Sequence, residues 1–129
     1  MEKNVIITKI ARHKLVLARA GEINLPPIVG MAFGNGGVDA LGNVIAPQDD
    51  QEELTSELYR KAIDRYVVLE NETATVRYEC TLLNNEVADM YISEIGLYDA
   101  EGDLVCIKTF KKKGKDDDLE MTFVLDDVF

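Results

Sequence analysis

One segment in the second half of the chain alternates strictly between apolar and polar side chains, and this pattern constrains the fold most. Its apolar residues are Val76, Tyr78, Cys80 and Leu82, and they alternate with Thr75, Arg77, Glu79 and Thr81. A period of two is typical of a strand that packs one face on a core and exposes the other to solvent. Residues 75–82 are therefore predicted to form a half-buried β-strand.

Further strands are predicted on both sides of this segment. They cover residues 29–33, 66–69, 91–98 and 104–110, and a final strand with Leu119, Met121, Phe123 and Leu125 inward and Glu120, Thr122 and Asp126 outward. The turn at residues 99–103 suits a hairpin in which Gly102 adopts a positive φ, and residues 111–118 form another hairpin loop. Consecutive strands with short connections favour antiparallel pairing.

Two helices are expected in the first half. Thr8 can cap a helix over residues 9–20, and Gly21 suits the left-handed conformation that often ends a helix. A second helix is predicted over residues 54–63. Its apolar face consists of Leu54, Leu58, Ala62 and Ile63 at helical spacing.

These elements predict an α+β fold in which two main helices pack on a mainly antiparallel β-sheet or sandwich. The length of 129 residues fits a single domain that covers residues 1–129. A chain of this size can bury a sizeable core without disulfides or metals.

The net charge of −10 disfavours nucleic-acid binding, because that function needs a basic surface to replace the counterions on phosphates. Two interpretations of the charge stay open: solubility alone, and an acidic face that meets a basic partner. No apolar run approaches ~20 residues, so no membrane-spanning helix is expected. No signal peptide is recognised either, and synthesis and residence in the cytoplasm are the default expectation.

No metal site, cofactor or catalytic residue is predicted. Cys80 and Cys106 stand alone in apolar strand patterns, so both are expected to be reduced core residues. The acidic stretches at 49–50 and 116–118 lack the ligand spacing of an EF-hand loop. His13 lies between two basic residues and is expected to be exposed, and the chain has no Gly-x-Ser-x-Gly nucleophile motif.

Two sites in the sequence could suggest phosphate binding or catalysis, but a structural role explains both of them better. The glycine-rich residues 34–37 are followed by Val38 and Asp39, which do not match the Lys-Ser/Thr of a phosphate-binding loop. Glu94 stands inside an apolar strand, where a buried carboxylate needs a partner. We expect a structural ion pair between Glu94 and either Arg60 or Arg77.

Three segments together carry a family resemblance. Residues 31–37 read Met-Ala-Phe-Gly-Asn-Gly-Gly, residues 54–60 read Leu-Thr-Ser-Glu-Leu-Tyr-Arg, and residues 93–105 read Ser-Glu-Ile-Gly-Leu-Tyr-Asp-Ala-Glu-Gly-Asp-Leu-Val. In this order they resemble the N-terminal domain of bacteriophage tail-collar fibre proteins, over roughly residues 7–125. The motif positions are Gly34, Gly36, Gly37, Glu94, Gly96, Asp99 and Gly102. The chain departs from the family pattern at Ser93, where many members have Arg, and it ends at Phe129, where longer members continue into a fibre shaft.

The resemblance implies a structural component of a phage or prophage tail, which docks or forms part of a tail fibre at the baseplate or collar. It implies tail or baseplate proteins as partners, a homotrimer by analogy with other tail fibres, and residence in a virion tail or tail-like particle assembled in the bacterial cytoplasm. It implies binding without enzymatic activity, while the net charge and the lack of a long apolar run argue against binding to nucleic acid or membrane.

Two other functions stay open from the residues alone. The acidic charge is compatible with a small interaction module of the inhibitor or immunity type that masks a basic site. The abundance of Asp and Glu is compatible with carboxylate-based enzyme chemistry, which would require a pocket with convergent carboxylates.

Overall fold

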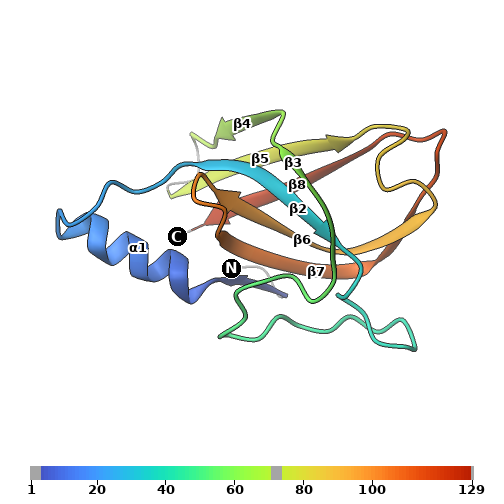
Figure 1. The fold of residues 1–129 in the computed structure, drawn as a ribbon, viewed down its shortest axis with the longest axis horizontal. Coiled ribbons are helices and arrows are strands. Elements are labelled where there is room, and N and C mark those ends of the chain that lie inside the picture. Colours follow the sequence, from blue (N-terminus) through green and yellow to red (C-terminus); the bar gives the residue numbers. More distant parts are fainter. Residues whose placement is uncertain (1–3, 71–73, 129) are drawn as a thin grey trace.

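The computed structural model describes residues 4–70 and 74–128. Within these residues the chain forms one α-helix and eight β-strands (Figure 1). In chain order the elements are β1 (Val5–Ile7), α1 (Lys9–Arg19), β2 (Ile28–Gly34), β3 (Glu57–Ala62), β4 (Arg65–Val68), β5 (Thr75–Leu82), β6 (Met90–Asp99), β7 (Leu104–Lys115) and β8 (Met121–Val128).

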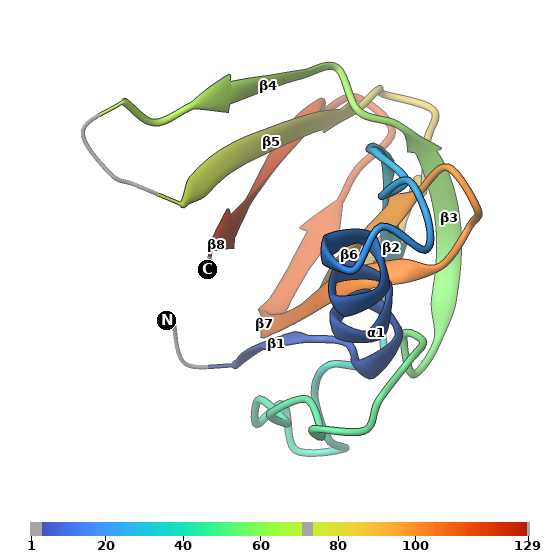
Figure 2. The same ribbon diagram turned by 90° about the vertical axis from the view of Figure 1, so that its left-hand side faces the viewer.

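The strands form two antiparallel sheets that face each other (Figure 2). The larger sheet has the strand order β1-β7-β6-β2-β3, and the smaller sheet has the order β4-β5-β8. α1 lies at one end of this sandwich, the same end as the C-terminus of β8 (Figure 1). The antiparallel β-structure expected from the alternating segments is therefore present.

The expected α+β fold with two main helices is wrong, because the protein is mostly β and α1 is the one helix in the part of the chain described. Residues 57–62 form β3, which pairs with β2 in a register that sets Lys61 opposite Met31 and Arg60 opposite Ala32. The pairing supplies partners to the backbone N–H and C=O groups of β2. Leu54, the first residue of the expected helical face, is buried just before the turn at residues 55–56 that leads into β3.

The first expected helix is confirmed, together with both of its caps. Thr8 Oγ1 accepts a hydrogen bond from the N–H of Ala11 at 3.2 Å, and the Thr8 hydroxyl donates to the carbonyl of Leu104 at 2.6 Å. Gly21 has a φ of +84°, and the following N–H of Glu22 donates back to the carbonyl of Leu17 at 2.9 Å. Thr8 thus begins α1 and also fixes it to the start of β7.

The two sheets are joined at one side by the short connection between β3 and β4. The N–H of Ile63 donates to the carbonyl of Val29 in the larger sheet, and the N–H of Asp64 donates to Glu79 in the smaller sheet. On the other side, β8 is the edge strand of the smaller sheet. One side of the sandwich is therefore closed by the chain itself and the other is not.

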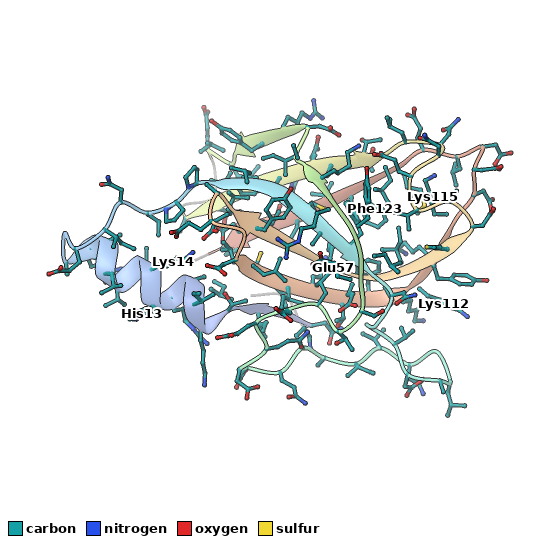
Figure 3. The ribbon with its side chains drawn as sticks, viewed as in Figure 1. His13, Lys14, Glu57, Lys112, Lys115 and Phe123 are labelled. Carbon is teal, nitrogen blue, oxygen red and sulfur yellow. The ribbon has the colours of Figure 1, made fainter. Side chains whose placement is uncertain are left out.

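The core lies between the sheets. Its buried members are Met31, Phe33, Cys80, Leu82, Ile92, Ile95, Leu97, Cys106, Phe123 and Leu125. The rings of Phe33 and Phe123 meet edge to face with centroids 5.3 Å apart, and Figure 3 shows Phe123 between the sheets. Cys80 and Cys106 are buried and free of any disulfide, as predicted, and burial raises the pKa of each thiol to about 12.

Candidate functional site

The carboxylate of Glu94 holds together two segments that are distant in sequence. Glu94 lies on β6 and is 0% exposed. Its Oε2 accepts hydrogen bonds from the N–H groups of Gly36 and Ser56, both at 2.8 Å, and its Oε1 accepts one from Thr55, also at 2.8 Å. A buried carboxylate is stable where several donors converge on it. Glu94 therefore fixes the glycine loop to the turn that precedes β3.

The expected ion pair of Glu94 with Arg60 or Arg77 is wrong. Arg60 pairs with Glu57, with 2.8 Å between Nε and Oε2, and its guanidinium lies over the ring of Tyr98. Arg77 pairs with Asp126 at 2.8 Å. The negative charge of Glu94 is stabilised by backbone N–H dipoles instead. Side-chain patterns in the sequence do not predict contacts of this kind.

The glycines of the loop permit this close approach. A Cβ atom at Gly37 would lie 2.0 Å from the carbonyl oxygen of Ser93, and one at Gly36 would lie 2.9 Å from Glu94 Oε2. A Cβ at Gly34 would lie 2.5 Å from the carbonyl oxygen of Ser56. The N–H of Gly37 donates to Ser93 Oγ at 2.9 Å. The N–H groups of Gly36 and Gly37, which a phosphate would need, are thus already bonded to side chains of β6.

Asp99, at the other end of β6, organises the hairpin that leads to β7. Its Oδ1 accepts hydrogen bonds from the N–H groups of Glu101 and Asp103 at 3.0 and 3.1 Å. Gly102 has a φ of +89°, as the hairpin pattern predicts. Gly96 lies between the two ends of β6, where an added Cβ would be 2.9 Å from the carbonyl oxygen of Cys106. Glu94, Gly96 and Asp99 thus serve three separate contacts along one strand.

A lysine from α1 neutralises the hairpin. Lys14 Nζ lies 2.7 Å from Asp99, 2.9 Å from Glu101 and 2.8 Å from Asp103. Lys14 is 8% exposed and faces the strands, whereas His13 is exposed as predicted (Figure 3). Burial lowers the pKa of Lys14, but the hydrogen bonds to the three carboxylates outweigh it and raise the pKa above its usual value.

The three hairpin carboxylates have the spacing of metal ligands. One oxygen from each of Asp99, Glu101 and Asp103 lies within 4.8 Å of the others, and no second such group occurs among the described residues. The ammonium of Lys14 already provides a cation at this point. The arrangement therefore serves to attach α1 to the β6–β7 hairpin.

A half-buried ion pair fixes the loop between β5 and β6. Glu86 Oε1 pairs with Lys61 Nζ at 2.7 Å, and Oε2 accepts a hydrogen bond from the Tyr59 hydroxyl at 2.6 Å. Burial raises the pKa of Glu86, but hydrogen bonds from Leu83 N–H, Lys61 and Tyr59 outweigh it and lower the pKa to about 2. This contact connects the edge strand β3 to the loop that follows β5.

Sequence reasoning missed Lys14 and Glu86. Lys14 interrupts the apolar stripe of its helix, and this interruption is the signal that could have revealed a buried cation. Glu86 lies in a loop with no periodic pattern, and its partners come from β3, so nothing local identifies it.

Two pockets lie beside these contacts. An open pocket of about 700 Å³ is lined by residues 48 and 50–53 of the acidic loop, together with Gly36, Ile45, Ala46, Thr55 and Thr109. A smaller pocket of about 210 Å³ lies beside α1 and contains Lys14, Asp99 and Asp127 among mainly apolar walls. The buried Oδ1 of Asp127 has no hydrogen-bond partner among the described residues.

A comparison with protein families agrees with the resemblance seen in the sequence. The model of a family described as "Phage tail-collar fibre protein, N-terminal" matches residues 1–123. No match was found among curated proteins or among solved structures. Among the described residues, no helix is long and apolar enough to cross a membrane.

Proposed function

The chain belongs to the phage tail-collar fibre protein family, and from this membership we propose that it docks a tail fibre, or forms part of one, at the baseplate or collar. The family makes it a structural component of the virion tail that associates with other tail proteins. We further propose that residues 1–129 act as one domain and that assembly takes place in the bacterial cytoplasm.

The use of the motif carboxylates inside the fold is the observation that supports a docking role most. Glu94 accepts hydrogen bonds from three backbone N–H groups, and Asp99 is bonded to its own hairpin and to Lys14. Polar groups engaged in this way hold loops in place and are not free to act on a substrate. A rigid module with fixed loops is suited to presenting a binding surface. We therefore propose binding, with no catalytic step and no cofactor.

Exposed apolar side chains at the α1 end offer one surface for such binding. They are Val16, Ile23, Leu25 and Val29. Apolar side chains that gather on a surface commonly mark protein interaction sites. The proposed partners are tail or baseplate proteins, with no role for nucleic acid or membrane.

A weak homotrimer is proposed by analogy with other tail fibres. The net charge of −10 repels identical copies within a Debye length of ~10 Å at 0.1 M salt. Self-association should therefore strengthen as salt is added. Light scattering across a salt series measures this, and a strict monomer at high salt and high protein concentration would contradict it.

The docking role is tested in the particle itself. Particles from a phage or prophage that lacks this protein should retain a complete tail tube but lose fibres, and added protein should restore them. Electron microscopy of the two preparations gives the result. Particles that carry a full set of fibres without the protein would contradict the proposal.

A further inference from the structure

Strand β8 carries a carboxylate at a position that faces the inside of the sandwich. Phe123 and Leu125 are buried between the sheets, and Asp127 occupies the next position on the same face of the strand. The neighbouring Asp126 faces the other way and pairs with Arg77, with 2.8 Å between Oδ1 and Nε. An aspartate thus stands where the alternation calls for an apolar residue.

The carboxylate of Asp127 has no partner within the part of the chain described. Its Oδ1 is buried and accepts no hydrogen bond. Lys14 lines the same pocket, but its ammonium is held by Asp99 and by two further carboxylates of the hairpin. Burial raises the pKa of Asp127. Asp127 as a whole is half-buried, but its buried Oδ1 stays unfavourable until a donor from another molecule reaches it.

The pocket beside Asp127 has the size and lining for a side chain. Its volume of about 210 Å³ is smaller than the range of ≈ 300–1,000 Å³ typical of small-molecule sites. Apart from Lys14, Asp99 and Asp127, the walls are mainly apolar and come from Ala11 and Leu15 of α1, from residues 25–28, from Tyr78 and from Val105. Leu25 at its edge is 50% exposed, so the pocket opens onto the apolar surface at the α1 end.

We propose that this pocket, the Asp127 pocket, receives one lysine or arginine side chain of a tail protein, with Asp127 as the counter-ion. The inference rests on the proposed docking function and names the chemistry of the partner at one point of contact. The aliphatic part of the incoming side chain lies along Leu15 and residues 25–28, and its charged end meets Asp127.

Charge complementarity favours a basic occupant over an apolar one. Two carboxylates, Asp99 and Asp127, line the pocket with Lys14, and the Lys14 ammonium is already paired with Asp99, Glu101 and Asp103. An apolar side chain would leave Asp127 without a partner, whereas a lysine or arginine combines an apolar stem with a charged head. The overall charge of −10 also attracts a basic surface from a distance.

The first experiment measures binding of n-butylammonium to the full chain by NMR titration. We expect the amide signals of Leu15, Leu25 and Val105 to shift and to saturate in the millimolar range, as suits so small a ligand. Asp127→Asn should weaken this binding about tenfold or more. The matched control is Asp126→Asn, which removes the same charge from the opposite face of β8 and should leave the binding unchanged.

Several results would overturn the inference. Absence of saturable shifts around the pocket is one, and equal affinity of Asp127→Asn and Asp126→Asn is another. Equal shifts with the neutral probe 1-butanol would show that the pocket selects only for an alkyl chain. Asp127→Asn should fold at least as stably as the unmodified protein, so its loss of binding would not reflect unfolding.

The second experiment separates this inference from the proposed function. Tail particles prepared without this protein are mixed with the unmodified chain, with Asp127→Asn or with Asp126→Asn, and bound protein is measured by sedimentation. Failure of the unmodified chain to bind would contradict the docking function, while the titration would still decide the pocket. Equal binding of all three proteins would contradict the pocket alone. We expect only Asp127→Asn to lose binding, by about tenfold or more.

Discussion

Glu94 and Asp127 are both carboxylates on core-facing strands, but their surroundings differ completely. Glu94 accepts hydrogen bonds from three backbone N–H groups at 2.8 Å each. Asp127 presents a buried oxygen with no partner among the described residues. The two lie toward opposite ends of the sandwich, with the glycine loop after β2 at one end and the C-terminus of β8 at the other (Figure 1).

The difference indicates which end of the molecule is built for stability and which is available for binding. Residues that break a folding rule without compensation within the fold tend to belong to functional sites. Glu94 obeys the rule that buried charges are satisfied, and Asp127 breaks it. We therefore assign the glycine-loop end to holding the fold and the α1 end to contact with a partner.

The largest effect is expected from Glu94→Gln. Whichever way the new amide is oriented, its NH₂ group faces a backbone N–H that now donates to Glu94, and the remaining hydrogen bonds lose their charge. We expect the free energy of unfolding to fall by about 4 kcal/mol. Urea denaturation measures it, with the exposed Glu53→Gln as the control of equal charge change. A loss of stability no greater than that of Glu53→Gln would contradict the claim that the hydrogen bonds to Glu94 stabilise the fold.

Gly37→Ala should come next. The added Cβ would lie 2.0 Å from the carbonyl oxygen of Ser93, so the loop must move away from β6. We expect a loss of about 3 kcal/mol, at the upper end for overpacking because the obstacle is backbone. Gly114→Ala is the control, since its Cβ would be 3.6 Å from the Tyr91 ring. Equal melting temperatures of the two variants would mean that the loop is not held closely.

Lys14→Met tests whether Asp99, once it has lost its cation, becomes an unpaired carboxylate like Asp127. The substitution leaves Asp99 buried without its cation, while Glu101 and Asp103 remain partly exposed, and we expect a loss of about 2 kcal/mol. Because the three carboxylates have metal-ligand spacing, Ca²⁺ should raise the melting temperature of the variant but not of the unmodified protein. Identical calcium responses would contradict this account of the cluster.

Glu86 should give the smallest effect, visible mainly through pH. Its pKa in the fold is about 2 against an ordinary value of 4.5, so its stabilising contribution is present above pH 4.5 and is lost as the pH falls toward 2. Glu86→Gln should therefore be less stable than the unmodified protein at neutral pH, and the gap should close in acid. Denaturation curves at a series of pH values provide the measurement, and a gap that does not change with pH would argue against the pairing with Lys61.

The sequence predicted those parts of the fold that have local causes. The strand at residues 75–82 follows from strict alternation, and the ends of α1 follow from Thr8 and Gly21. The helix predicted for residues 54–63 is wrong, although the apolar spacing of this segment fits a helix. Its structure is decided by the pairing of β3 with β2, and local spacing does not encode that pairing.

The candidate site was predictable only in part, for a related reason. The sequence identified Glu94 as a buried carboxylate, but its hydrogen-bond donors are the backbone N–H groups of Gly36, Thr55 and Ser56. Every residue except proline has such a group, so residue types cannot predict which ones donate. Asp127 could have been found by extending the inward alternation of Phe123 and Leu125 by one step. Its lack of a partner depends on the packing of α1 against the sheets, which alternation does not describe.

The most direct test of the contrast between the two carboxylates is a single set of thermal melts at neutral pH. Glu94→Gln should lower the melting temperature, because it removes a satisfied charge. Asp127→Asn should raise it by about 4 °C, corresponding to about 1 kcal/mol, because it removes a charge that the fold leaves unpaired. Since the pKa of Asp127 is raised in the fold, this gain should vanish when the pH falls below the ordinary pKa of an aspartate. A shift of both variants in the same direction would contradict the account.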